Sequence, residues 1–218
     1  ILGFFGPFFY HIMYFIVTFK SKIISCQKRL VKNKKKYYLV FPSEINKVWL
    51  KKSIKPKLDK PRLLYVGRMK IEKGIYSLIK ILEQSKENFK LSIVGSDKEN
   101  NNKNNSIFYY TQQTKTKSLI KLYDKNNIFI LPSFTEAHPK VIDESLARIR
   151  PVIIFEEIKH IVQNRSGIFI AQRNIDSLNK TIKYIINNYS NIQKKIRKNN
   201  LPTKEKFIQK FCSILALK

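Results

Sequence analysis

Cysteine is scarce in this chain of 218 residues, which contains only two. Cys26 and Cys212 lie far apart and lack the spacing of metal ligands, which excludes a paired Cys/His finger. We expect two buried thiols in a reducing compartment.

Acidic residues are also few. The 15 Asp and Glu residues face 43 Lys and Arg residues, so the formal net charge is +28. Such a charge suits a nucleic acid, an anionic lipid or a phosphorylated substrate as partner. A compositional bias towards Lys, Asn, Ile, Tyr and Phe, typical of AT-rich coding sequences, explains the charge equally well. No finger or aromatic-rich RNP pattern accompanies the basic residues, so nucleic acid is the less favoured partner.

A long uninterrupted apolar run is missing too. Residues 1–19 are strongly apolar, but Gly3, Gly6, Pro7 and His11 interrupt them, whereas a membrane span needs about 20 apolar residues. The features of a signal peptide are absent. We expect a buried or membrane-facing segment of an amino-terminal domain, with His11 in its core; a membrane anchor is the alternative. Because the first residue is Ile rather than Met, we expect the true start to lie upstream.

The most informative stretch is residues 128–155, IFILPSFTEAHPKVIDESLARIRPVIIF. Its pattern predicts a strand at Ile128–Leu131, a loop, a helix from Pro139 to about Arg150, and a strand at Val152–Phe155. A strand–helix–strand unit of this size is a βαβ crossover. The sheet is therefore predicted to be parallel.

The start of this helix is a candidate anion site. Pro139 has no N–H, and the amides of Lys140 and Val141 stay free at the positive end of the helix dipole. Glu136 precedes the helix and Glu144 lies on its second turn. Ionised carboxylates only accept hydrogen bonds, so they suit sugar and ribose hydroxyls on either side of a phosphate. Two solvated glutamates on a surface helix are the alternative.

Strands and helices alternate along the rest of the chain. A strand and a short basic helix are expected within Ser21–Lys36, a hinge at Ser43–Pro61 that Trp49 anchors by burial, and an exposed basic segment at 193–200. The other expected strands are Tyr37–Pro42, Arg62–Val66, Phe89–Gly95, Ile107–Thr111 and Ile168–Ala171, and the other expected helices are Gly74–Glu83, Lys117–Tyr123, Ile175–Tyr189 and Thr203–Leu217.

Three segments, VGRMKIEKG, LSIVGS and PSFTEAHPKVIDESLARIRPVI, carry a family resemblance. They stand in the order and spacing of the nucleotide-sugar-binding domain of GT-B retaining glycosyltransferases. Over about Tyr38–Lys218 the chain resembles family 4 of these enzymes, the glycosyl transferases group 1. The motifs are weak singly and specific in combination. The resemblance implies an α/β fold, a Rossmann-like parallel sheet with helices on both faces, with a remnant of the amino-terminal domain.

The resemblance also implies three parts of the chain. Residues 1–59 correspond to the carboxy-terminal part of an incomplete acceptor domain plus the linker. Residues 60–200 correspond to the nucleotide-sugar-binding domain, and residues 201–218 to a closing helix that crosses back to the amino-terminal domain.

By resemblance, Arg68 and Lys73 hold the donor diphosphate, which gains negative charge as the glycosidic bond breaks. Gly67 lets the chain turn sharply before them. Glu136 meets the hydroxyls of the donor sugar, and Glu144 meets those of the ribose. The predicted catalytic residues are Glu136, Arg68 and Lys73, and the predicted donor-binding residues are Gly67, Arg68, Lys73, Glu136, His138, Lys140, Val141 and Glu144.

The chain departs from the family at several positions. Residues 136–138 read Glu-Ala-His where Glu-Gly-Phe is common, and His138 is either a donor contact or a helix residue without a task. Ile149 stands where a helix-ending glycine is common, which predicts a different closure of that helix. Tyr109 and Tyr110 precede a position near the nucleobase, and either stack on the base or pack in the sheet.

The sequence contains no Asp-x-Asp motif for a divalent metal, so we expect no metal and no cofactor. Arg68, Lys73 and the helix start at Lys140 would neutralise the diphosphate instead. The resemblance implies transfer, with retention, from a nucleotide-sugar donor to a glycan or lipid-linked acceptor in cell-surface polysaccharide biosynthesis. We expect the protein in the cytoplasm, with peripheral association at the anionic cytoplasmic face of the inner membrane as an alternative.

Two other hypotheses stay open. A non-catalytic basic module for nucleic acid or anionic membrane predicts salt-sensitive, sequence-independent binding that is indifferent to Glu144. A truncated pseudoenzyme that binds donor alone is the other.

Overall fold

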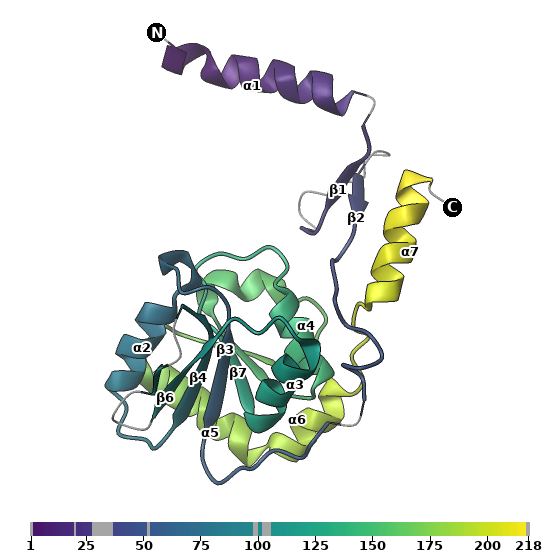
Figure 1. Cartoon of the computed structure of the whole chain (residues 1–218). Helices are drawn as coiled ribbons and strands as arrows, with labels where there is room; N and C mark the ends of the chain where they lie inside the picture. The colour runs from purple at the N-terminus through teal and green to yellow at the C-terminus, as the bar shows by residue number, and fades with distance from the viewer. Residues whose placement is uncertain are drawn as a thin grey trace. The chain divides into compact units, whose positions relative to one another are not determined.

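The computed structural model describes residues 2–19, 21–27, 37–51, 53–97, 100–101 and 106–216. The chain divides into two compact units, which are residues 1–42 with 204–218, and residues 43–203 (Figure 1).

The larger unit is built on a seven-stranded sheet with the order β5-β6-β4-β3-β7-β8-β9. Its strands are β3 (Arg62–Val66), β4 (Lys90–Ser96), β5 (Asn100–Asn101), β6 (Ile107–Thr111), β7 (Ile128–Leu131), β8 (Val152–Phe155) and β9 (Ile168–Ala171). Only the pairing of β5 with β6 is antiparallel among these strands. The predicted parallel α/β sheet is therefore confirmed.

Helices cover both faces of this sheet (Figure 1). They are η2 (Ile71–Lys73), α2 (Ile75–Glu83), α3 (Thr116–Lys125), α4 (Lys140–Ala147), η3 (Glu156–Ile161), α5 (Ile175–Asn187) and α6 (Tyr189–Ile196). The chain crosses the sheet in one direction through α2 and in the other through α3 and α4. Right-handed crossovers then place α2 on the face opposite α3 and α4. Leu82 of α2 and Ile182 of α5 line one cavity, so α5 shares the face of α2.

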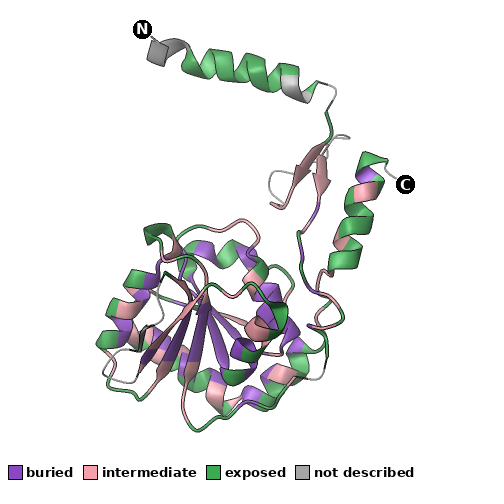
Figure 2. Ribbon diagram, viewed as in Figure 1, coloured by how far each residue is buried: buried purple, intermediate pink, exposed green. Residues whose placement is uncertain are grey.

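The core lies between the helix layers and the central strands (Figure 2). Every residue of β7 and β8 is buried, because parallel strands covered on both faces meet no water. Their sequences, IFIL and VIIF, are accordingly apolar without alternation.

The described part of the linker, residues 43–51 and 53–61, is bound to the larger unit. Trp49 is buried and packs edge-on against the ring of Tyr123, so the predicted anchor is confirmed. Arg148 Nη1 donates to the carbonyl oxygens of Trp49 and Lys51, both at 2.8 Å. Arg150 Nη2 donates to the carbonyl of Ile54 at 2.7 Å. These side chains satisfy backbone carbonyl oxygens of the linker that no helix or strand pairs.

The basic segment expected to be exposed at 193–200 is exposed at most of its positions, but α6 buries Ile196 within it and Ile192 just before it. Lysines dominate its composition, but two isoleucines four residues apart define a buried helix face. The two cysteines, which were expected to be buried, are both partly exposed and free.

The smaller unit contains α1 (Leu2–Thr18), β1 (Ile23–Ser25), β2 (Tyr37–Leu39) and α7 (Lys204–Leu215), with β1 and β2 paired in parallel. Side chains at 6–16 are exposed, His11 among them, so the expected packed histidine was wrong, whereas the membrane-facing alternative for this segment stays a prediction. No helix among the described residues has both the length and the apolar content to cross a bilayer. The expected short basic helix falls largely at 28–36, outside the described residues.

Candidate functional site

The predicted site residues follow β3 and β7, whose carboxyl ends meet at one edge of the sheet. There, Lys73 Nζ lies 2.7 Å from Glu136 Oε1, and both side chains are mostly buried. Ser133 Oγ donates to the same oxygen at 2.8 Å. Glu136 Oε2 has no hydrogen-bond partner among the described residues, so one carboxylate oxygen remains available to a ligand.

The two loops of the site are joined by backbone contacts. The amide of Phe134 donates to the carbonyl of Glu72 at 3.0 Å. Gly74 has a φ of +67°, and a Cβ built on it would lie 1.9 Å from the carbonyl oxygen of Pro132. A glycine is needed here both for the left-handed backbone and for the close approach. This contact holds Lys73 beside the loop that carries Glu136.

Gly67 and Arg68 lie directly after β3. A Cβ on Gly67 would lie 2.7 Å from the hydroxyl of Tyr65, which donates to the carbonyl of Arg68 at 2.8 Å. The pKa of Tyr65 is raised by burial first and then by the charge of Glu136, while Arg68 lowers it. Both charges are therefore within electrostatic reach of one hydroxyl. The Arg68 side chain is exposed and forms no ion pair within the described part of the chain.

The start of α4 lies next along the chain. The helix begins at Lys140, with Pro139 as N-cap, one residue later than predicted. Within the described ranges, the amides of Lys140 and Val141 have no acceptor, whereas the amide of Ile142 donates to Pro139 at 3.2 Å. Lys140 is exposed, and its Nζ lies 3.8 Å from Glu44 Oε1. Two free amides at a helix start can donate to an anion, so the anion site at this helix start stays a prediction.

His138 is turned into the protein interior. Its side chain is only 4% exposed, and its Nε2 lies 3.0 Å from Oδ2 of Asp143. The other oxygen of Asp143 pairs with Arg165 Nη1 at 2.6 Å. The side chain therefore connects the Glu136 loop to the first turn of α4, and a donor contact of His138 stays a prediction.

Glu144 is buried on the second turn of α4. Tyr123 Oη donates to its Oε2 at 3.0 Å. Burial raises the pKa of Glu144, whereas the hydrogen bond from Tyr123 and the charge of Lys140 lower it. Tyr123 is fully buried and was not singled out from sequence. In the sequence, the one feature that could have indicated Tyr123 is its polar hydroxyl on an otherwise apolar helix face just before β7.

The carboxyl end of α4 closes in the left-handed conformation despite the missing glycine. Ile149 has a φ of +57°, which is rare for a β-branched residue. The amide of Arg150 donates to the carbonyl of Ser145 at 3.0 Å, the bond that such a closure makes. The predicted different closure was wrong, because the buried side chain of Arg150 holds the turn from outside the helix.

Three further residues complete the surroundings of the site. His160 of η3, also not anticipated, lies with its Nε2 2.9 Å from the carbonyl oxygen of Glu136. Tyr109 and Tyr110 both pack against the hydrophobic core, the packing alternative for these residues.

Comparison with known proteins agrees with this architecture. The family model described as glycosyl transferases group 1 matches residues 47–201. An uncharacterized glycosyltransferase of Haemophilus influenzae is 28% identical over 194 residues, 80% of this chain and 54% of that protein. The capsular polysaccharide biosynthesis glycosyltransferase CapM of Staphylococcus aureus is 29% identical over 139 residues, 58% of this chain and 37% of that protein.

The fold is shared with solved structures. The crystal structure of Anabaena HepE in complex with UDP and glucose matches with a TM-score of 0.65 at 13% identity, over 90% of this chain and 63% of that one. The chain spans about half the length of the Haemophilus relative. Since the family model covers most of the chain, including every predicted site residue, the protein belongs to the glycosyl transferases group 1 family.

Proposed function

We propose that the larger unit binds a nucleotide-sugar donor, and that the protein transfers the sugar to a glycan or lipid-linked acceptor. The observation that supports this most is the placement of Lys73 against Glu136. One cation and one carboxylate with a spare oxygen stand at the sheet edge where α/β folds bind their ligands. The UDP in the HepE complex is consistent with such a donor.

In this proposal the diphosphate is held by charge and by amides. Arg68 and Lys73 supply fixed cations, and the free amides of Lys140 and Val141 supply donors at the positive end of α4. Negative charge grows on the leaving nucleoside diphosphate as the glycosidic bond breaks, so these groups stabilise the transition state more than the ground state. We propose no metal and no further cofactor for this step.

The two carboxylates are proposed to bind hydroxyls. Glu136 Oε2 would accept from the donor sugar, because its Oε1 is occupied by Lys73 and Ser133. Glu144 would accept from the ribose through Oε1, because Tyr123 occupies Oε2. We further propose that transfer retains the anomeric configuration. The relative CapM suggests polysaccharide biosynthesis, which would place the protein in the cytoplasm or at the cytoplasmic face of the membrane.

Calorimetric titration with UDP, GDP and the corresponding nucleosides tests the donor site. We expect one nucleoside diphosphate to bind at least about tenfold more tightly than its nucleoside, since two cations and two amides contact only the phosphates. Arg68→Met should weaken diphosphate binding alone, and Glu144→Gln should weaken both ligands. Binding that is equal in wild type and both variants, or no binding by the wild type, would contradict the donor site.

A further inference from the structure

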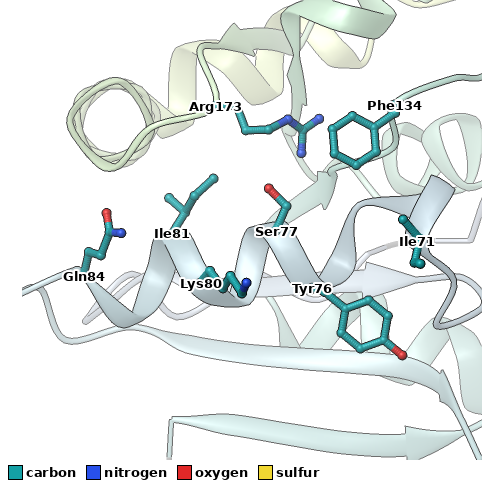
Figure 3. Close-up of a pocket in the computed structure, with 8 residues that line it drawn as sticks. All are labelled: Ile71, Tyr76, Ser77, Lys80, Ile81, Gln84, Phe134 and Arg173. Atoms are coloured by element: carbon teal, nitrogen blue, oxygen red, sulfur yellow. The ribbon is translucent and has the colours of Figure 1, made fainter.

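Arg173 reaches across the sheet edge from the loop after β9. Its Nη2 donates to the carbonyl oxygen of Pro132 at 3.0 Å. Its guanidinium carbon lies 4.1 Å from the ring centroid of Phe134 and 4.4 Å from that of Phe155, so the planar group is held between two aromatic rings. Figure 3 shows the guanidinium beside the ring of Phe134.

The remaining nitrogens of Arg173 contact two other segments. Nε pairs with Glu157 Oε1 at 2.7 Å, and this hydrogen bond is the main reason why the pKa of Glu157 is lowered. Nη1 is buried without a hydrogen-bond partner among the described residues, and a Cβ built on Gly74 would lie 3.3 Å from it. One side chain therefore bonds to the end of β7 and to the start of η3, and lies beside Gly74 at the start of α2.

These three segments carry or support the Lys73–Glu136 pair. Pro132 and Phe134 flank Ser133, which binds Glu136, and Gly74 follows Lys73 directly. We infer that Arg173 is a positioning residue that holds the loop of Glu136 against Lys73. The inference rests on the proposed function for its consequence in donor binding, whereas the positioning itself is a property of the ligand-free protein.

Arginine suits this position because its planar fork stacks and donates in several directions at once, which a lysine ammonium cannot do. A groove of about 430 Å³ runs beside it, between α2 and the Phe134 ring (Figure 3). Arg173 and Phe134 form one wall of this groove, and Ser77 and Ile81 of α2 face them across it. Because Nη2 and Nε are both bonded to the segments around the Lys73–Glu136 pair, we expect Arg173 to act through Lys73 and Glu136.

The test uses Arg173→Met, which removes the charge and the donors, and Arg173→Lys, which keeps the charge but not the planar fork. Lys183→Met, which removes an exposed cation paired with Glu87, is the matched control. Hydrogen exchange of the Phe134 amide, which donates to Glu72, reports the loop without any ligand. We expect this exchange to accelerate about tenfold or more in Arg173→Met, less in Arg173→Lys, and not in the control.

Titration with the nucleoside diphosphate that the wild type binds gives the second readout. Arg173→Met should lower the affinity for the nucleoside diphosphate about tenfold and change the affinity for the nucleoside little. In a protein that already carries Lys73→Met, Arg173→Met should lower the affinity no further. The inference would be overturned if hydrogen exchange at Phe134 were unchanged, or if the two substitutions lowered the affinity independently, so that their fold-losses multiplied. If the wild type bound no nucleoside diphosphate, the proposed function would fail, while exchange at Phe134 would still decide the positioning role.

Discussion

Lys73 and Glu136 are 63 positions apart in the chain, yet their side chains meet at 2.7 Å. The contact joins the loop after β3 to the loop after β7, two strands that are neighbours in the sheet. A charged hydrogen bond that is mostly shielded from water holds the two side chains in a fixed orientation. An incoming diphosphate would share Lys73 with Glu136, so donor binding and sugar orientation are coupled through one ammonium group.

Replacement of Lys73 by Met should therefore weaken binding of a nucleoside diphosphate by about 10- to 100-fold, the range of one charged hydrogen bond. Binding of the nucleoside should change little. Calorimetry on both ligands measures the effect. Lys70→Met is the control, because Lys70 is an exposed cation on the same loop. A similar loss in the two variants would show that general positive charge, and not the Lys73 position, binds the phosphates.

Removal of the Tyr123 hydroxyl should change the pH dependence of binding. The hydrogen bond from Tyr123 lowers the pKa of Glu144, so Tyr123→Phe raises that pKa further above its ordinary value. In the proposed site, the ribose is bound by the ionised carboxylate, so we expect binding to be lost as the pH falls through the pKa of Glu144. The midpoint of this loss should move to higher pH in Tyr123→Phe, measured as nucleotide affinity against pH. In Tyr189→Phe, which alters a buried tyrosine that bonds Asn127, the midpoint should stay in place.

Glu144 should also impose a pH dependence on folding. Burial raises its pKa in the folded state above the ordinary 4.5, so between these two values the folded state binds more protons. The contribution of Glu144 to stability is then complete below the unfolded pKa and is lost as the pH rises through the folded pKa. Urea unfolding of Glu144→Gln across this range should show a smaller decrease in the free energy of unfolding with rising pH than the wild type shows. Glu83→Gln, which alters an exposed glutamate, should show the same decrease as the wild type.

Gly74→Ala should destabilise the larger unit by more than about 1 kcal/mol, because alanine is strained at positive φ and its Cβ would collide with Pro132. Urea unfolding measures the change. Gly6→Ala is the comparison, since Gly6 lies in α1 with no heavy atom within 4 Å of the added Cβ. Equal stability of Gly74→Ala and wild type would show that the two loops can separate freely.

The buried ion pair that contacts the linker should contribute more to the free energy of unfolding than an ion pair at the surface. Asp124 pairs with Arg148 at 2.7 Å, and both side chains are almost fully buried. Asp124→Asn leaves that arginine uncompensated and should cost about 3–5 kcal/mol in the free energy of unfolding. Asp59→Asn, which breaks an exposed pair with Arg62, should leave stability unchanged within error. Comparable effects of the two substitutions would contradict the assigned role of burial.

Residues with local signals were identified from the chain alone. The apolar runs of β3, β7 and β8, the glycines at 67 and 74, and the proline before α4 each express a constraint on a few neighbouring residues. Because backbone conformation and burial depend on consecutive residues, the parallel sheet could be predicted, and the start of α4 could be predicted to within one residue. The family resemblance added the order of the motifs.

Only the tertiary structure decided which side chains meet. It turned His138 inward to Asp143, gave Glu144 a buried partner in Tyr123, and placed Arg173 between Phe134 and Phe155. These partners come from strands and loops far apart in the chain, where no periodicity relates one residue to another. Local conformation depends on neighbouring residues and can be predicted from them. The direction of a buried polar side chain depends instead on which surrounding segments provide a hydrogen-bond partner for it.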